Sequence, residues 1–222
     1  MDASTGLGVL SLDAQKLNVL QLNESLRQVP SSTTTIRIIG CQAPDLLAPG
    51  LNTNCRLSIQ GDLGDYCLCG MSNAEVEIKG RAGCGLGEAT ESGSILLDGD
   101  ACDAAGAFNR GGFIAIYGNA SRRTAVGMCG GDVVVKGSIG SQGAMGMKSG
   151  ALLILGSAGP MLGQDMQGGT IYIRGSFASL SPHLEESRIR EADRLRISLL
   201  FLKAGIQGEA RDFRVLRVGV AS

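Results

Sequence analysis

Cysteine is the residue type in this chain best suited to metal or redox chemistry, and seven cysteines occur among its 222 residues. Cys67 and Cys69 are one residue apart, whereas zinc knuckles need C-x₂₋₄-C pairs. No second pair at such a spacing and no iron–sulfur spacing occurs, and in the repeat described below three cysteines fall in different columns: Cys84, Cys102 and Cys129. An odd number of cysteines argues against a disulfide framework and favours a reducing compartment. We therefore predict no metal or redox site and interpret the cysteines as small packing residues.

The single histidine and one glycine-rich segment are the next candidates for chemistry. His183 has the side chain of a general base, but it stands at the start of a predicted helix, where a solvated capping residue is more typical. The segment GRAGCGLGE (80–88) resembles a phosphate-binding loop, yet a dinucleotide fingerprint needs a helix directly after its glycines, and another strand follows here. We predict no catalytic, cofactor-binding or metal-ligating residue.

The carboxylates do not form the pattern of a catalytic or calcium-binding solenoid. Calcium-binding nonapeptide solenoids need aspartate at a fixed spacing, and we find no common register for the aspartates at 62, 65, 98, 100, 103 and 132. A β-helix that cleaves polysaccharide needs clustered outward carboxylates. The outward column that would have to supply them reads Lys79, Asp98, Tyr117, Lys136, Leu155 and Arg174.

The elements that position all these residues follow from a repeat of nineteen residues. Such a spacing is typical of a solenoid in which each repeat is one turn, and it predicts an all-β, parallel β-helix of about seven turns with one strand per turn. We interpret the recurring glycines as turn residues, because glycine tolerates left-handed backbone and stacked corners leave no room for a Cβ. They are Gly61, Gly80, Gly99, Gly118, Gly137, Gly156 and Gly175.

Two positions in each predicted strand are always apolar, and they lie two residues apart, so they face the same way. Stacked turn by turn, they predict two aliphatic columns in the core. The first is Val76, Ile95, Ile114, Val133, Leu152 and Ile171, and the second is Ile78, Leu97, Ile116, Val135, Ile154 and Ile173.

The position between these columns faces outward, and it is polar only at its start, Glu77. A strand that is apolar on both faces is normally covered on both. We therefore expect the sheet to be covered from about Leu96 onward, by the chain's own terminal helix or by a partner subunit. The candidate partner-covered face is Leu96, Val134, Leu153 and Tyr172.

Flanking segments divide the chain into an N-terminal β-α-β lead (1–40), the β-helix (41–180) and a C-terminal helix and tail (181–222). The lead is predicted as a strand over 8–12, a helix over about 14–27 capped by Asp13, and a strand over 33–40. Residues 41–60 resemble a degenerate first turn. The C-terminal helix is expected over 184–204, starting after Ser181-Pro182 and ending at Gly205. Its predicted apolar face is Ile189, Ala192, Leu195, Leu199 and Leu202.

Charge and hydropathy exclude several function classes. The net charge is −1 with scattered Lys and Arg, which argues against binding to nucleic acid or to an acidic membrane. The apolar runs are too short to span a bilayer, and no signal peptide opens the sequence, so we expect a cytoplasmic protein.

The pattern G-x-x-G-x-x-x-G, complete at 80–87 and 156–163, resembles the GXGXG domain of the glutamate synthase large subunit. The segments DAQKLNVLQLNESLRQ, GDLGDYCLCGM, GGTIYIRGSFASL and DFRVLRV extend the resemblance over nearly the whole chain. The resemblance implies a right-handed β-helix without catalytic residues, packed between a glutamine amidotransferase and an FMN/iron–sulfur synthase barrel and framing the ammonia path. Because the sequence opens with Met1-Asp2, we expect it to lack the N-terminal cysteine nucleophile that an amidotransferase needs.

By this resemblance, the chain is a non-catalytic subunit in nitrogen metabolism, in a complex for glutamate or N-methylglutamate synthesis. It holds no cofactor, and FMN and an iron–sulfur cluster are expected in amidotransferase-like and synthase-like partner subunits; a homo-oligomer stays open. An alternative with the same fold is the β-helical subunit of formylmethanofuran dehydrogenase or of the formyltransferase/hydrolase complex. Departures from the glycine pattern at Leu68, Cys102 and Ser121 leave the branch open. A third hypothesis is an independent β-helix enzyme acting on carbohydrate.

Overall fold

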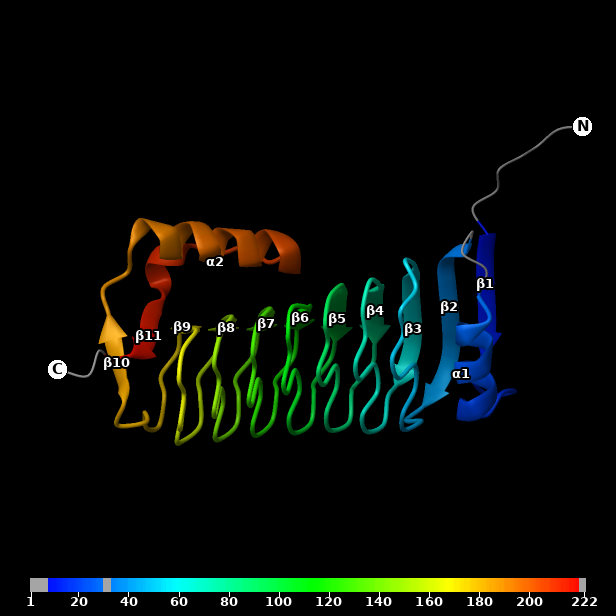
Figure 1. Cartoon of the computed structure of the whole chain (residues 1–222), viewed down its shortest axis with the longest axis horizontal. Coiled ribbons are helices and arrows are strands. Elements are labelled where there is room, and N and C mark those ends of the chain that lie inside the picture. Colours follow the sequence, from blue (N-terminus) through cyan, green and yellow to red (C-terminus); the bar gives the residue numbers. More distant parts are fainter. Residues whose placement is uncertain (1–7, 30–32, 220–222) are drawn as a thin grey trace, which may run out of the picture.

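Each nineteen-residue repeat forms one coil, and the coils stack into a rod (Figure 1). The computed structural model describes residues 8–29 and 33–219. Within these residues eleven strands form one sheet, in the order β1-β2-β3-β4-β5-β6-β7-β8-β9-β11-β10. The strands of the coils are β3 (Arg56–Asp62), β4 (Glu75–Lys79), β5 (Ser94–Asp98), β6 (Phe113–Ile116), β7 (Asp132–Val135), β8 (Ala151–Ile154) and β9 (Thr170–Ile173).

Parallel pairing in register confirms the predicted β-helix. Leu57 pairs with Val76, Val76 with Ile95, and every later pair is again nineteen residues apart. Both aliphatic columns lie in the core, since no member is more than 1% exposed. A second line of single bridges joins neighbouring coils at the same spacing, through Ala82, Ala101, Ala120, Ile139, Ala158 and Phe177.

The N-terminal lead consists of β1 (Gly8–Asp13), α1 (Val19–Arg27) and β2 (Thr33–Gln42). β1 pairs in parallel with β2, which pairs with β3, so the lead continues the sheet of the coils. The helix begins later than predicted because Asn18 supplies the cap: its Oδ1 accepts the N–H of Gln21 at 3.0 Å, and the Gln21 side chain accepts the N–H of Asn18 at 3.0 Å. Asp13 instead stabilises a turn by accepting the N–H of Gln15 at 3.0 Å.

The repeated glycines lie where the backbone of one coil passes directly over the next. A Cβ on Gly99 would stand 2.0 Å from the carbonyl oxygen of Gly80, and one on Gly80 would stand 2.3 Å from that of Gly61. Among the seven repeated glycines, only Gly61 and Gly80 have positive φ, of 114° and 155°. Close approach of stacked backbones, more than left-handed conformation, therefore requires glycine in this column.

Left-handed backbone occurs instead at three other positions of each coil, two residues apart. In the coil that starts at Gly80 these are Gly85, Gly87 and Ala89, with φ of 70°, 62° and 54°. The equivalent three positions have positive φ in every coil from Gly61 to Gly156, including non-glycine residues such as Ala104 (60°). Each coil has one or two glycines at these three positions, and glycine relieves the steric cost wherever it occurs there.

The C-terminal segment folds back over the coils (Figure 1). It contains β10 (Leu184–Ser187), α2 (Glu191–Ala204), the short 3₁₀-helix η1 (Ala210–Asp212) and β11 (Arg214–Val218). β11 pairs antiparallel with both β9 and β10. The predicted helix start at Ser181-Pro182 was therefore wrong, because residues 184–187 find a strand partner in the segment predicted as a tail. The predicted end is confirmed: Gly205 is left-handed, with φ of 61°.

Helix α2 packs with a different face from the predicted one. Its buried residues are Asp193, Ile197, Leu200, Phe201 and Ala204. The leucines of the predicted face are exposed, by 62% at Leu195, 44% at Leu199 and 78% at Leu202. The helix has two apolar stripes. The buried stripe contains Asp193, whose charged side chain is typical of a surface residue, so the sequence pattern favours the other stripe.

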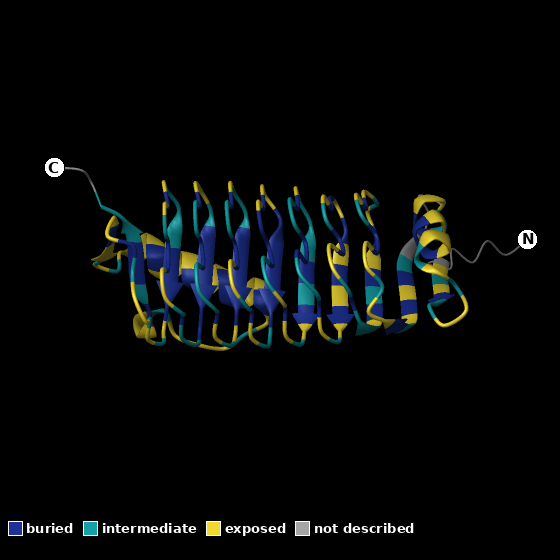
Figure 2. Cartoon of the chain, turned by 90° about the horizontal axis from the view of Figure 1, so that it is seen from below, coloured by how far each residue is buried: buried dark blue, intermediate teal, exposed yellow. Residues whose placement is uncertain are grey.

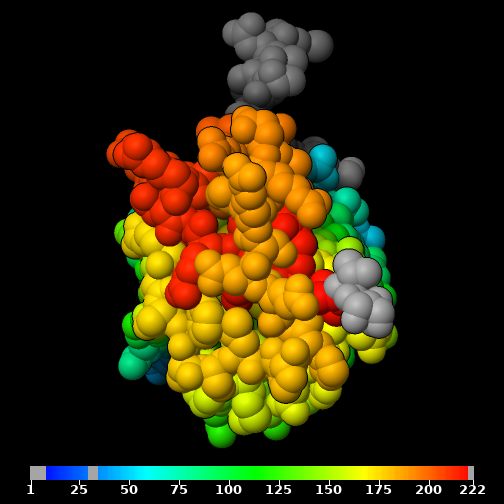
Figure 3. Space-filling view, turned by 90° about the vertical axis from the view of Figure 1, so that its left-hand side faces the viewer, coloured from blue at the N-terminus to red at the C-terminus, as the bar shows by residue number. Residues whose placement is uncertain are grey.

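Burial changes along the sheet in step with this cover (Figure 2). In β4 the residues alternate between buried and exposed, whereas all four residues of β6, β7 and β8 are buried. Seen end-on, the C-terminal segment lies across the β9 end of the rod and rises above it (Figure 3). The apolar part of the outer face is thus enclosed, and the polar part is open.

Candidate functional site

The outer face of β6 to β9 is covered by the chain itself. Val134 and Leu153 are fully buried and Tyr172 is 3% exposed, in a second core shared with α2 and β11. Leu96 packs against the edge of this core and is partly buried. Of the two covers that the sequence allowed, the structure has the chain's own C-terminal segment over Val134, Leu153 and Tyr172.

A buried polar cluster holds the C-terminal segment in place. The Oδ1 atom of Asp193 accepts hydrogen bonds from Tyr172 Oη at 3.1 Å and from the Arg217 guanidinium, while its Oδ2 atom accepts the N–H of Arg190 at 2.8 Å. Burial, followed by the charge of Asp193, raises the pKa of Tyr172 to about 12. The cluster joins β9, α2 and β11, so its role is structural.

A second ion pair connects the middle of the helix with the sheet. Asp132, at the start of β7, is 5% exposed and accepts a hydrogen bond from Arg196 at 2.5 Å. The ammonium group of Lys203 lies 3.9 Å from the same carboxylate. The two cations come from α2, so the helix is tethered along its length.

The outer face of α2 is the clearest candidate for contact with another molecule. Leu195, Leu199 and Leu202 are four and then three residues apart, so they form one exposed apolar row, which we call the leucine stripe. Contiguous exposed apolar residues are typical of protein–protein contacts, whereas isolated ones are ordinary. The leucine stripe is the face that the sequence had assigned to the interior.

A second surface lies beyond the end of α2, on the uncovered outer face of β2 to β5. A pocket of about 280 Å³ is lined there by Arg37, Ser58, Glu77 and Leu96, among others. Arg56 and Glu75 form an exposed ion pair at 3.0 Å on its rim. This open face is polar, in contrast to the covered face of the following coils.

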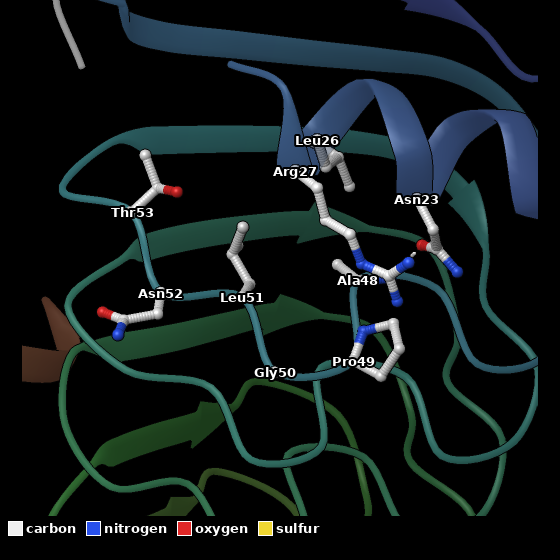
Figure 4. A pocket seen from close by; sticks show the side chains of 9 residues that line it. All are labelled: Asn23, Leu26, Arg27, Ala48, Pro49, Gly50, Leu51, Asn52 and Thr53. Carbon is white, nitrogen blue, oxygen red and sulfur yellow. Dashed lines mark hydrogen bonds between the residues drawn. The ribbon is translucent and has the colours of Figure 1, made fainter. Parts of the chain in front are cut away.

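A smaller pocket of about 190 Å³ lies between α1 and the first coil (Figure 4). The Asn23 side chain there bonds the backbone of the first coil, since it accepts from Ala48 N at 2.7 Å and donates to Leu46 O at 2.8 Å. The Asn52 oxygen accepts from Asn73 Nδ2 at 2.7 Å. Only Arg27 supplies a charge to this pocket, so we assign it no chemistry.

The cysteines are distributed differently from the prediction. Cys84 and Cys102 belong to neighbouring coils, and their sulfur atoms lie 3.3 Å apart although the two residues are in different columns. Cys41 and Cys67 are buried, and burial raises the pKa of each thiol to about 11. Within residues 8–29 and 33–219, no three His, Cys, Asp or Glu side chains are grouped as metal ligands.

His183 and the aspartates have structural surroundings. His183 is exposed in the turn before β10, so it does not cap the helix. Asp62 accepts the N–H of Arg81 at 2.8 Å, and Asp100 accepts that of Asn119 at 2.6 Å. These two aspartates are two coils apart in one column, so the view that the aspartates share no register was wrong. The same column continues as a ladder of side-chain oxygens through Asn119, Ser138 and Ser157.

Across the described ranges, neither helix has the length and apolar character needed to cross a membrane.

Comparison with known proteins gives a family match that covers most of the chain. No curated protein matches the chain. Residues 22–199 match the family described as GXGXG motif, a range that includes most of α1, all the coils and most of α2. The chain therefore belongs to the GXGXG family.

Proposed function

We propose that this chain is a non-catalytic structural subunit of a glutamate-synthase-type complex, bridging a glutamine amidotransferase and an FMN-dependent synthase and framing the ammonia path between them. Membership of the GXGXG family supports this proposal, because the domain is found in glutamate-synthase-type proteins. FMN and the iron–sulfur cluster belong to the partner subunits in this proposal.

The observation that carries the proposal is the leucine stripe. One face of α2 packs on the coils, whereas the opposite face exposes three large apolar side chains. A helix that only closed the solenoid would gain nothing from leucine there, whereas a helix between the coils and a partner uses both faces.

A bridging subunit needs two separate contact surfaces. The leucine stripe suits an apolar contact, and the open face of β2 to β5, with Arg37 and Glu77, suits a polar one. The two surfaces differ in chemistry, so we expect each to bind a different partner.

The test is co-purification of the tagged chain from its native cells, with glutaminase activity and the flavin absorbance spectrum as readouts. We expect both in the purified complex, and no glutaminase activity from the isolated chain. L195S/L199S/L202S should remove one partner and keep the other, while L20S, at a leucine of α1 that is 75% exposed, should remove neither.

Glutamate release from glutamine by the isolated chain would overturn the proposal. A complex without flavin, whose partner has a metal-dependent amidohydrolase fold, would instead place the chain in a formylmethanofuran-type complex of one-carbon metabolism.

A further inference from the structure

We propose that Cys84 and Cys102 form a redox site, a dithiol on the corner of the solenoid that closes to a disulfide by exchange with a low-molecular-weight disulfide. This inference is independent of the proposed function. It starts from one distance: the sulfur atoms of the two residues lie 3.3 Å apart.

The backbone around the pair is already at the right spacing. The N–H of Cys102 donates to Ala82 O at 2.9 Å, and the N–H of Gly85 donates to Asp103 O at 2.9 Å. These bonds lie on both sides of the thiols and hold the two coils like adjacent strands, about 4.8 Å apart. Disulfides join Cα atoms about 4.4–6.8 Å apart with sulfurs at about 2.05 Å, so rotation of the side chains suffices.

The two thiols differ in accessibility in the way that exchange requires. Cys102 is exposed, so its sulfur can meet a dissolved reagent, whereas Cys84 is half-buried behind it. The Cys84 thiol donates a hydrogen bond to the Cys102 sulfur, so the two reacting atoms already face each other. The Arg122 guanidinium beside the pair donates to Asp103 Oδ2 at 2.7 Å, so its charge is balanced by a carboxylate.

The chemistry proceeds in two exchange steps. The Cys102 thiolate attacks one sulfur of oxidised glutathione, which forms a mixed disulfide and releases one glutathione thiolate. The Cys84 thiol then loses its proton to solvent, and its sulfur attacks the Cys102 sulfur and expels the second glutathione thiolate. Two protein thiols are oxidised to one disulfide, and one oxidised glutathione is reduced to two glutathione molecules.

Oxidation can be followed by peptide mass, because the pair lies in one tryptic peptide, residues 82–110, with no internal Lys or Arg. The folded chain is equilibrated over a series of glutathione ratios, alkylated and digested. We expect this peptide to lose two hydrogen atoms and to escape alkylation. Cleavage at Glu88 or Glu91 should then give two peptides that separate only after reduction.

Cys129 is the matched control, since it is also exposed but has no thiol neighbour in the described chain, and it lies in the separate tryptic peptide 124–136. It should form only a mixed disulfide with glutathione. Because closure at Cys84–Cys102 is intramolecular, half-oxidation should need roughly tenfold less oxidised glutathione than at Cys129.

Two variants distinguish the steps. C84S should trap the mixed disulfide on Cys102, and C102S should leave Cys84 alkylated and slow to react. Far-UV circular dichroism of each variant shows whether the solenoid remains folded. The proposal is overturned if the folded wild-type chain carries two alkyl groups or two glutathiones on peptide 82–110 across the series, or if Cys84 and Cys102 oxidise no more readily than Cys129.

Discussion

Replacement of Asp193 by alanine should weaken the attachment of the C-terminal segment without releasing it. Asp193 is 3% exposed and accepts bonds from Tyr172, Arg217 and the Arg190 backbone. Removing one partner of a buried ion pair costs about 3–5 kcal/mol, because the other charge stays buried without compensation. Arg217 is the charge that D193A leaves behind, and one of its guanidinium nitrogens is already buried without a partner.

The apolar contacts of α2 contribute more stability than D193A removes. Ile197, Leu200 and Phe201 of α2 are each at most 5% exposed, and full burial of each side chain contributes about 1.5–3 kcal/mol. Their sum, roughly 5–9 kcal/mol, exceeds the loss from D193A. The helix should therefore stay docked at low denaturant and separate earlier than the coils as urea rises.

The assay is urea unfolding followed by far-UV circular dichroism, with hydrogen exchange of α2 amides to locate the loss. D193A should lower the free energy of opening α2 by about 3–5 kcal/mol and leave the amides of β4 and β5 unchanged, since repeat proteins couple mainly between neighbours. In a cycle with R217M, the double variant should be less destabilised than the sum of the single variants. A loss from D193A below about 1 kcal/mol, or additive effects in the cycle, would refute the role assigned to this cluster.

Three further predictions test the corners and the tyrosine. Burial raises the pKa of Tyr172 to about 12, so its neutral form is favoured in the folded state. The stability that this gives is complete below the ordinary tyrosine pKa near 10 and is lost as the pH rises from about 10 to 12. Y172F should remove this alkaline loss of stability in pH-dependent urea titrations. G99A should lower the free energy of unfolding by more than about 2 kcal/mol, because its Cβ would meet the carbonyl oxygen of Gly80 at 2.0 Å. G146A, with φ of 64° and no atom within 4 Å of its Cβ, should lower it by only about 1 kcal/mol. Equal losses of stability in thermal denaturation would contradict this. A104G should stabilise the fold by about 0.5 kcal/mol by relieving a left-handed alanine, and a lower melting temperature would argue against strain there.

Most of the coil architecture could be predicted from the sequence, because a nineteen-residue period stacks like positions on one another and leaves little freedom of register. The C-terminal segment could not be predicted as well, since it does not repeat. Leu195, Leu199 and Leu202 have the spacing of a buried face, and only the partners of Asp193 show which stripe turns inward. The contact between Cys84 and Cys102 could not be predicted either. The two residues are one position out of register, and the nineteen-residue columns indicate only contacts in register.

The outward column between the two aliphatic columns explains how the covered and open surfaces come to lie side by side. It is polar at Glu77 and fully buried at Val134 and Leu153. The residue at this position therefore determines where cover is needed, and α2 lies over the coils that need it (Figure 1). The coils before Leu96 carry polar outward residues, which can stay in water without a cover. The position of the open face thus follows from the repeat itself, and this face adjoins the C-terminal end of the helix that carries the leucine stripe.

Substituting Glu77 with leucine would extend the apolar column by one coil without lengthening α2. We therefore expect the altered chain to self-associate through that face in sedimentation experiments, whereas E77Q should sediment like the unaltered chain.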